Sequence, residues 1–393
     1  MKATYYLVLP LNLAKRTLMF IVGVFESLNL TNFRSQKKYS QCIVRPNSVL
    51  VVETFSTHGE TLSGVIKYFQ DLGYNVDIFI RHFHRRLGLA WVDNIRSYAL
   101  STWSMKKFLL SSKCNNYEFV FFNTFDSQQT FGLPTTLTVL DWLGKTPPAK
   151  YGVLGIYHNL KTLNQDPLKQ LLESHRLFAL NEYTNQIPLL NSNDFSVSSP
   201  TVKFSNPRLL NRKIKFLLSG RIIPKVREFP MLLETVSELI QHNYTNFEIN
   251  IVGSKSPSIP SILRKRIKFL GWLKFDSFQK EVENSDFLIT LLNSSNKYHQ
   301  GYMQYKTTGT KQLALGFLKP LIIEKPFADI YGFDAQNAVV YTNNLTLAFE
   351  RVLNMSTEEY STMQSNLKKF RDTVRAKSLN NLQDVIKNIV TIQ

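Results

Sequence analysis

Continuous apolar runs alternate along this chain with segments whose apolar residues recur at helical spacing. Ser48–Glu53 is almost entirely apolar, as is typical of a strand buried on both faces of a parallel sheet. A polar turn follows, and then a helical pattern over Thr61–Leu72 that Gly73 ends. Val76–Ile80 is a second strand. This order of strand, loop, helix and strand predicts the opening of a doubly wound α/β sheet.

The alternation continues through the first half and then begins again near residue 214. Further strands of the first half are predicted at Phe119–Phe122, Val153–Tyr157 and Leu177–Leu180. In the second half the pattern predicts strands at Ile214–Ser219, Phe247–Val252, Ile267–Gly271, Phe287–Leu292 and Pro320–Ile323, and helices at Pro230–His242, Phe275–Asn284 and Thr310–Leu315. Alternation this regular favours two Rossmann-like units with parallel sheets.

The length of the chain, 393 residues, suits two domains. We therefore divide it into an N-terminal extension over 1–45, a first Rossmann-like domain over 46–205 and a second over 206–360. Residues 361–393 are predicted to form C-terminal helices that could cross back to the first domain. The Ser-, Asn- and Pro-rich stretch 191–207 reads as the linker between the two domains.

The net charge indicates which kinds of partner the protein binds, and the cysteine content indicates the redox compartment in which it resides. Lys and Arg number 47 against 29 Asp and Glu, which gives a formal charge of +18 and a pI near 9.7. Such a charge predicts an anionic partner, which could be a nucleic acid, an anionic membrane surface or a phosphorylated substrate. Cys42 and Cys114 form neither a metal-type pair nor a disulfide framework, which favours a reducing compartment.

The N-terminal stretch Tyr5–Leu30 is apolar and aromatic, but Pro10 and the Lys15–Arg16 pair interrupt it. We therefore expect neither a transmembrane helix nor a secretory signal there. Leu18–Leu28 could form a short amphipathic helix that lies on a bilayer, or a helix packed on the first domain. These features predict a cytoplasmic protein that could be peripheral on the inner face of a membrane.

The most informative polar segment precedes the helix predicted at Thr310–Leu315. Thr308 and Thr310 are residues that cap helices, Gly309 lies between them, and Lys306 stands just before. The first amides of a helix have no partner inside it, and the helix dipole adds partial positive charge there. A diphosphate fits such a site, and Lys306 and Lys311 would add positive charge beside it.

Two other loops of the second domain should lie at the same edge, because ligands bind outside the carboxyl ends of parallel strands. Gly220 and Arg221 follow the first strand of that domain, with Lys225 and Arg227 close behind, and Gly253 follows the second strand. An arginine there can hold phosphate oxygens with two parallel hydrogen bonds. We take all five residues as candidates for phosphate binding.

Candidate proton acceptors occur in the loops of the first domain. His58 and Glu60 follow its first strand, and His158 follows the strand Val153–Tyr157. A histidine or glutamate in such a place could accept a proton from the hydroxyl group of a substrate.

Five short segments of the second half share their order and spacing with a known family. They are Phe216–Lys225, which contains Gly-Arg and then Pro-Lys, Phe247–Gly253, Ile267–Trp272, Asn284–Ile289 and Ala314–Ile322. Together they resemble the C-terminal domain of GT-B glycosyltransferases, particularly the large retaining group that builds cell-surface polysaccharides. The first half is similar to that family only in layout.

The resemblance implies a hexosyltransferase-like enzyme that moves a sugar from a nucleotide diphosphate sugar, of the UDP or GDP type, to a glycan or a lipid-linked acceptor. The donor would bind in the second domain and the acceptor in the first, in surface polysaccharide or glycoconjugate synthesis. We expect no cofactor, and no metal, because no Asp-x-Asp pair flanked by an apolar strand occurs. Inversion would require His58, Glu60 or His158 as a base, whereas retention would let the leaving phosphate take the proton.

One departure from the family keeps other readings open. The retaining group often carries two Glu residues eight positions apart, and counting back from Gly316 these positions hold Met303 and Lys311. A GT-B-like protein without transferase activity is therefore one alternative. A basic nucleic-acid-binding protein is another, although no interleaved basic and aromatic motif supports specific recognition.

Overall fold

The computed structural model describes residues 34–35, 37, 39–40, 43–53, 59–81, 92–125, 149–162, 168–184, 186–192, 213–223, 226–254 and 257–392. The chain divides into two compact units. The first comprises Met1–Leu180, Gln186–Leu190 and Leu379–Gln393, and the second comprises Asn181–Asn185 and Asn191–Ser378. Asn181–Asn185 therefore belongs to the second unit, although the residues on both sides of it belong to the first.

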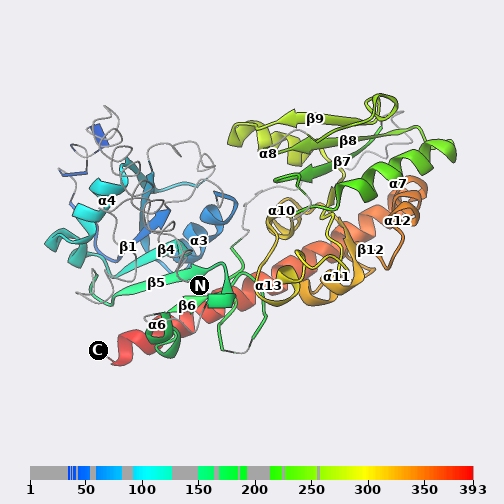
Figure 1. Ribbon diagram of the computed structural model, residues 1–393. Helices are drawn as coiled ribbons and strands as arrows, with labels where there is room; N and C mark the ends of the chain where they lie inside the picture. Colours follow the sequence, from blue (N-terminus) through cyan, green and yellow to red (C-terminus); the bar gives the residue numbers. More distant parts are fainter. Residues whose placement is uncertain are drawn as a thin grey trace, which may run out of the picture. The chain divides into compact units, whose positions relative to one another are not determined.

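The first unit contains a six-stranded parallel sheet of order β3-β2-β1-β4-β5-β6, with helices packed on it (Figure 1). Its strands are β1 Ser48–Glu53, β2 Asn75–Arg81, β3 Ile95–Leu100, β4 Phe119–Phe125, β5 Val153–Tyr157 and β6 Leu177–Phe178. Its helices are α3 Gly59–Asp71, α4 Thr102–Leu109 and α6 Leu168–Glu173, with short 3-10 helices at Ser112–Asn116 and Leu160–Thr162.

Strand β1 shows why the apolar runs are continuous. Leu50 and Val52 belong to a core that α4 and α6 cover, whereas Val49 and Val51 belong to a second core on the opposite face. That second core is closed by α3 and by the last turns of α13 (Thr357–Ile392). Because successive side chains of a strand point to opposite faces, a sheet covered on both faces requires apolar residues at every position.

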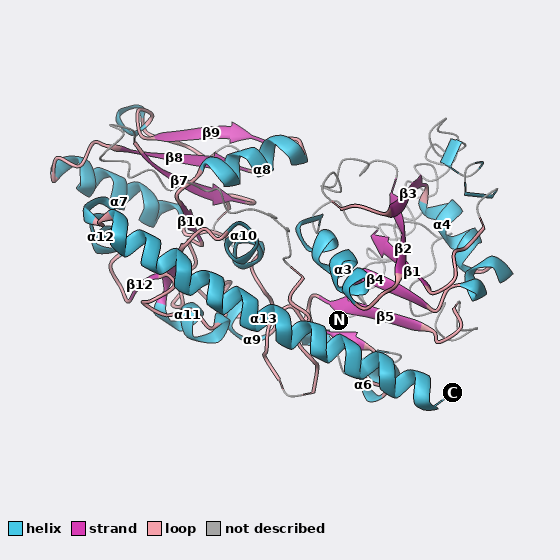
Figure 2. Ribbon diagram, turned by 180° about the vertical axis from the view of Figure 1, so that it is seen from behind, coloured by secondary structure: helices cyan, strands magenta, loops and turns pink. Residues whose placement is uncertain are grey.

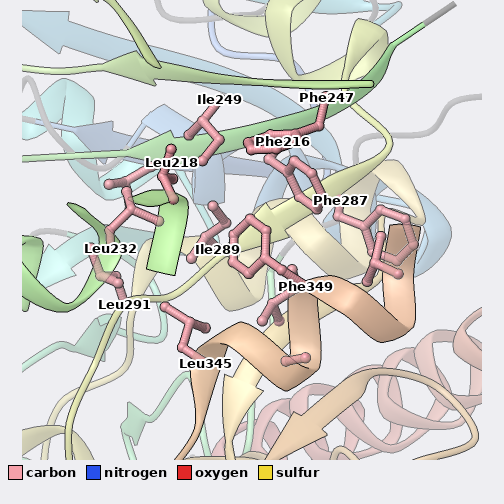
Figure 3. Close-up of a cluster of buried hydrophobic side chains, with 14 of the residues drawn as sticks. Phe216, Leu218, Leu232, Phe247, Ile249, Phe287, Ile289, Leu291, Leu345 and Phe349 are labelled. Carbon is pink, nitrogen blue, oxygen red and sulfur yellow. The ribbon is translucent and has the colours of Figure 1, made fainter. Parts of the chain in front are cut away.

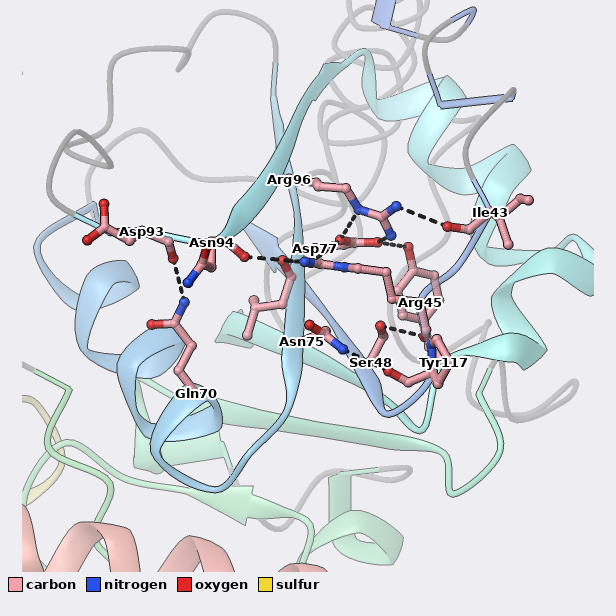
Figure 4. Close-up of polar contacts among 12 residues, drawn as sticks. Ile43, Arg45, Ser48, Gln70, Asn75, Asp77, Asp93, Asn94, Arg96 and Tyr117 are labelled. Carbon is pink, nitrogen blue, oxygen red and sulfur yellow. Dashed lines mark hydrogen bonds and ion pairs between the residues drawn. The ribbon is translucent and has the colours of Figure 1, made fainter.

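A buried carboxylate lies near the start of β2, away from the carboxyl ends of the strands (Figure 4). Asp77 is 1% exposed, and it accepts hydrogen bonds from Arg45 at 2.9 Å, from Arg96 at 2.5 Å and from the Tyr117 hydroxyl at 2.6 Å. Two cations and a phenol thus compensate one buried charge, which makes this a structural cluster of the first unit.

The second unit repeats the architecture with the order β12-β11-β10-β7-β8-β9, again fully parallel. Its strands are β7 Ile214–Ser219, β8 Phe247–Val252, β9 Ile267–Gly271, β10 Phe287–Ile289, β11 Leu321–Glu324 and β12 Val339–Tyr341. Its helices are α7 Phe229–Gln241, α8 Phe275–Asn284, α9 Gly301–Gln304, α10 Gly309–Phe317, α11 Lys325–Tyr331 and α12 Leu345–Asn354, with a 3-10 helix at Ser261–Leu263.

Helices α7 and α12 cover one face of this second sheet. Phe216 of β7 lies at the centre of their shared core, with its ring centroid 4.6 Å from that of Phe349 in α12, and Leu232 of α7 packs in the same cluster (Figure 3). Helix α13 continues from this unit as one helix of 36 residues (Figure 2). Its residues from Leu379 onward belong to the first unit.

The predicted fold class, α/β with two Rossmann-like doubly wound units, is confirmed, because both sheets have the strand order of a Rossmann sheet. Three predicted elements need correction. The strand predicted over Leu177–Leu180 ends at Phe178. The strand predicted over Phe287–Leu292 ends at Ile289, since Leu291 has a left-handed φ of 49° that a strand cannot contain. The C-terminal segment is a single helix that begins at Thr357, before the predicted residue 361.

Several predictions concern residues outside those described. They include the helix over Leu18–Leu28, most of the extension over 1–45 and the linker 193–207 with the boundary at 205/206. In the part of the chain that the structure describes, no helix has the length and apolar character needed to cross a bilayer.

Candidate functional site

The chain order of the strands in the second sheet reverses between β7 and β10, and ligands of such sheets bind at this point, outside the carboxyl ends of the strands. The loop after β7 carries Gly220 and Arg221, and the loop after β8 carries Gly253. Gly271 is the last residue of β9. The structure thus brings the predicted residues of two separate loops to one edge of the sheet.

Two glycines let these loops lie backbone against backbone. Gly220 has a φ of 110°, which side chains rarely allow, and its amide donates to the Val252 carbonyl at 2.9 Å. A Cβ atom added at Gly253 would stand 1.7 Å from the Gly220 carbonyl oxygen. The Gly253 amide in turn donates to the Gly271 carbonyl at 3.0 Å. The two loops and the end of β9 therefore continue the ladder of the sheet as one closely packed edge.

The two arginines of the β7 loop occupy different environments. Arg221 is exposed. Arg227 is only 5% exposed, and its guanidinium donates to the Ser219 carbonyl at 3.0 Å and to the Val226 carbonyl at 2.8 Å. Burial lowers the pKa of Arg227, and within the described ranges no carboxylate forms an ion pair with it. Arg227 thus supports the Gly220 loop from beneath, while Arg221 is the arginine that a ligand can reach.

The start of α10 offers one backbone amide. Thr308 is the N-cap, and its hydroxyl accepts from the Thr310 amide at 3.3 Å. Burial raises the pKa of the Tyr331 hydroxyl, and the nearby Thr308 backbone offsets a part of this. The Gly309 amide has no hydrogen-bond partner among the residues that the structure places. Of the three predicted backbone groups, Gly309 is therefore the one that remains available to an anion at this helix end.

A chain of contacts joins the β7 loop to this helix end. Burial lowers the pKa of Arg227, and the nearby Tyr302 side chain offsets a part of this. The Tyr302 carbonyl accepts from the Tyr331 hydroxyl at 3.0 Å, and Tyr331 also contacts Thr308. The two segments that the sequence singled out for phosphate binding are thereby tied together through Arg227, Tyr302 and Tyr331.

The lysines of this region also differ in environment. Lys306 is exposed, with its amine 5.6 Å from the centroid of the Tyr305 ring. Lys311, in the first turn of α10, is 2% exposed and donates to Asn181 Oδ1 at 2.5 Å. Its amine lies 5.3 Å from the centroid of the Tyr331 ring. Lys306 can therefore meet a ligand, whereas Lys311 is part of the interior. The predicted Lys225 lies outside the described residues.

Two carboxylates that the sequence reasoning missed hold the loop after β10. Glu324, at the end of β11, accepts from the Ser294 amide at 2.6 Å and from its hydroxyl at 2.9 Å. Glu228 accepts from Asn296 at 2.8 Å. The position of Glu324 at the carboxyl end of a predicted strand was a usable signal. The groups of three or more His, Cys, Asp or Glu that bind a metal ion do not occur among the residues described.

Only one of the three predicted proton acceptors can be placed in full. His58 lies outside the described residues, and Glu60 is in the first turn of α3 with its side chain likewise outside them. His158 follows β5, and its Nε2 lies 3.0 Å from the Asn123 carbonyl. Because a carbonyl only accepts, Nε2 carries the proton and Nδ1 is the acceptor of the neutral ring. Burial lowers the pKa of His158 to about 4, so the ring is neutral at pH 7.

A buried cluster surrounds that carbonyl at the switch point of the first sheet. Glu53, at the end of β1, is fully buried and accepts from the Asn123 amide at 2.5 Å and from the Thr124 hydroxyl at 2.9 Å. Thr61 of α3 donates to the Asn123 side chain at 3.2 Å. Asn123 thus fixes His158 through its carbonyl while Glu53 and Thr61 fix Asn123. The sequence reasoning missed Glu53 and Asn123.

Two Rossmann-like units, the second with a glycine-lined edge beside a helix start, are the architecture of the GT-B fold. A glycosyltransferase structure from Rickettsia africae is similar to this chain with a TM-score of 0.53 and 12% identity, covering 88% of this chain and 99% of that one. Anabaena HepE, in complex with UDP and glucose, is similar with a TM-score of 0.51, 10% identity and coverage of 88% and 99%. AviGT4, a glycosyltransferase involved in avilamycin A biosynthesis, is similar with a TM-score of 0.50 and 11% identity, covering 87% of this chain and 98% of that one.

These likenesses show that the chain has the GT-B fold. No model of a protein family matches the sequence, and no curated protein matches it.

Proposed function

We propose that this protein is a glycosyltransferase that takes a sugar from a nucleotide diphosphate sugar, of the UDP or GDP type, and passes it to a glycan or a lipid-linked acceptor. The observation that carries the proposal is the contact chain Arg227–Tyr302–Tyr331–Thr308. It ties an exposed arginine loop to a helix start at the carboxyl edge of a GT-B-type unit. HepE, which has the same fold, is described in complex with UDP and glucose.

In the proposed reaction, cleavage of the bond to the sugar leaves negative charge on the diphosphate. Arg221, Lys306 and the Gly309 amide would stabilise that charge directly, and Arg227 would add positive charge from beneath the Gly220 loop. The acceptor would bind the first unit, near His158. His58, Glu60 and His158 are the candidate bases for inversion, and the leaving phosphate is the proton acceptor for retention.

An exposed tryptophan offers a surface for the base of the nucleotide. Trp272 directly follows the carboxyl end of β9 and is 69% exposed, and the preceding Gly271 accepts from the Gly253 amide. We predict that Trp272→Ala weakens UDP or GDP binding about 5- to 100-fold, since stacking on an aromatic ring contributes about 1–3 kcal/mol per base. Calorimetric titration checks this, with Trp272→Phe as the control that keeps a ring. Equal affinities for wild type and Trp272→Ala would remove this residue from the site.

The packed glycine edge yields a second prediction. Gly253→Ala places a Cβ against the Gly220 carbonyl, which must move and take Arg221 with it. We expect UDP affinity to fall at least about tenfold, equivalent to about 1.4 kcal/mol. The matched control is Gly271→Ala, because Gly271 has a φ of 71° but no atom within 4 Å of an added Cβ. If the two variants bind UDP equally, the clash between the added Cβ and the Gly220 carbonyl does not govern UDP binding.

The direct test of the proposed function is nucleotide release from a panel of UDP- and GDP-sugars, with and without glycan acceptors. Release of UDP or GDP that depends on the sugar donor supports the transferase. Binding of UDP without release from any donor would favour the alternative of a non-catalytic GT-B-like protein. Binding of nucleic acid that vanishes in moderate salt and shows no sequence preference would reflect only the charge of +18.

The wider role is part of the same proposal. We propose surface polysaccharide or glycoconjugate synthesis, without a divalent metal, by a cytoplasmic protein in peripheral contact with an anionic membrane. The charge of +18 and the apolar stretch Tyr5–Leu30 support membrane contact. Co-sedimentation with anionic vesicles, compared for the full chain and a variant lacking residues 1–40, tests it. Equal sedimentation of the two would rule out that stretch as the contact.

A further inference from the structure

Two tyrosine hydroxyls, one on the half-buried Tyr183 and one on the buried Tyr331, hold the connection between α9 and α10. Tyr183 donates to the Lys306 carbonyl and lies 3.2 Å from the Thr307 hydroxyl. Tyr331, fully buried in α11, donates to the Tyr302 carbonyl at 3.0 Å. Helix α9 is only four residues long, so its last carbonyls have no continuing helix to bond them. The two phenols supply the donors that this short helix lacks.

Tyr331 also lies beside Thr308, the N-cap of α10. Its hydroxyl lies near the Thr308 backbone, donates to the Tyr302 carbonyl at 3.0 Å and lies 3.4 Å from the Lys306 carbonyl. A single hydroxyl group therefore spans the turn from the end of α9 to the N-cap of α10. The orientation of the next amide, that of Gly309, follows from where this hydroxyl fixes Thr308.

Tyr183 reaches the second unit on a segment from elsewhere in the sequence. Asn181–Asn185 belongs to the second unit although its neighbours on both sides belong to the first. Asn181 anchors this segment, because its amide donates to the Ile330 carbonyl at 3.2 Å and its Oδ1 accepts from Lys311 at 2.5 Å. Tyr183 is thus fixed against α10 and α11, and not only against the turn.

We propose that Tyr183 and Tyr331 are positioning residues of the donor site: together they fix the Lys306–Thr308 turn so that the Gly309 amide and Lys306 face the diphosphate. This inference rests on the proposed function, since it names what orients that site. Neither phenol touches the ligand. Their effect is to spare the ligand the cost of ordering the turn, which is how preorganisation raises affinity.

The experiment compares Tyr183→Phe and Tyr331→Phe with a matched control. Tyr360→Phe removes a similar bond, because the buried Tyr360 hydroxyl donates to the Asp286 carbonyl at 2.9 Å, before the start of β10 and away from the site. Titration with UDP and with inorganic pyrophosphate should show about 3- to 20-fold weaker binding of both ligands for the first two variants. The control should bind like wild type although it loses comparable thermal stability.

A second readout does not depend on the ligand. Amide hydrogen exchange in the peptide covering 306–312 should accelerate in Tyr183→Phe and Tyr331→Phe, and stay at the wild-type rate in Tyr360→Phe. Asn181→Ser loosens the segment Asn181–Asn185 but keeps the Tyr183 and Tyr331 hydroxyls. It should also accelerate exchange and weaken UDP binding, but less than the tyrosine variants do. This milder variant serves where a tyrosine variant is too unstable to titrate.

The outcomes separate the two proposals. If the wild type binds neither UDP nor pyrophosphate, the proposed function fails, while the exchange rates still report whether the phenols order the turn. If the wild type binds both ligands and the tyrosine variants bind them equally well, the positioning role fails alone. Equal exchange acceleration in all three phenylalanine variants would also overturn it, because a general loss of stability would then explain the effect.

Discussion

Arg221→Ala is expected to lower the rate of nucleotide release about 100- to 1,000-fold at saturating donor, with a smaller effect on donor binding. Removing one preorganised donor to developing negative charge costs about 2–4 kcal/mol of transition-state stabilisation. Arg221 is the exposed arginine of the β7 loop, whereas Arg227 is occupied by the Ser219 and Val226 carbonyls. We therefore expect Arg221 to be the residue of the β7 loop that contacts the phosphate.

Two further variants sharpen this result. Arg221→Lys keeps the charge but not the two parallel donors, so it should recover only a part of the lost rate. Arg264→Ala removes another exposed arginine, which lies before the start of β9 at the opposite edge of the sheet, and should leave the rate unchanged. An Arg221→Ala enzyme with wild-type kcat and kcat/KM would exclude the arginine from the site.

Lys311→Met is expected to abolish a rise in stability that the wild-type protein shows between pH 7 and pH 9. Burial lowers the pKa of Lys311 to about 7, although attraction by Glu182 offsets a part of this. An unfolded lysine titrates near pH 10.4. Between those two values the unfolded chain carries a proton that the folded protein has released, so the free energy of unfolding rises with pH. Below pH 7 both states are protonated, and this dependence disappears.

The expected size of the effect is about 1.4 kcal/mol per pH unit, or about 2–3 kcal/mol from pH 7 to pH 9. Urea unfolding at pH 7, 8 and 9 measures it, and the slope against pH should be present in wild type and absent in Lys311→Met. Lys280→Met, which replaces an exposed lysine, should keep the wild-type slope. Identical slopes in wild type and Lys311→Met would mean that Lys311 stays charged in the folded protein.

Most of the fold could be predicted from the sequence, because the alternation of buried runs and helical spacings is a local property. The strands β5, β7, β8 and β9 have the predicted bounds. Elements with weaker periodicity were missed, among them β3 and α4. Strand β3 reads Ile-Arg-Ser-Tyr-Ala-Leu, and its first three positions are half-buried or exposed at the sheet edge, so it lacks a continuous apolar run.

The residues of the candidate site also divide into those that the sequence could predict and those that it could not. Gly220, Gly253 and the Thr308–Thr310 cap were accessible to sequence reasoning, because positions after strands and before helices have characteristic residue types. The sequence could not assign different environments to Arg221 and Arg227, which look alike in a basic loop. Nor could it place Tyr183 beside Lys306, because 123 positions separate them and only packing brings them together.

By itself the sequence determined the two α/β units and the edge of the second sheet where a ligand should bind, because hydrophobic periodicity and terminal glycines act over a few neighbouring residues. Only the tertiary structure decided which cations are buried and which polar groups still face outward. Burial, and the pKa of Lys311 that follows from it, depend on segments such as Asn181–Asn185 that reach the site from distant parts of the chain. Those contacts form only when the whole unit folds.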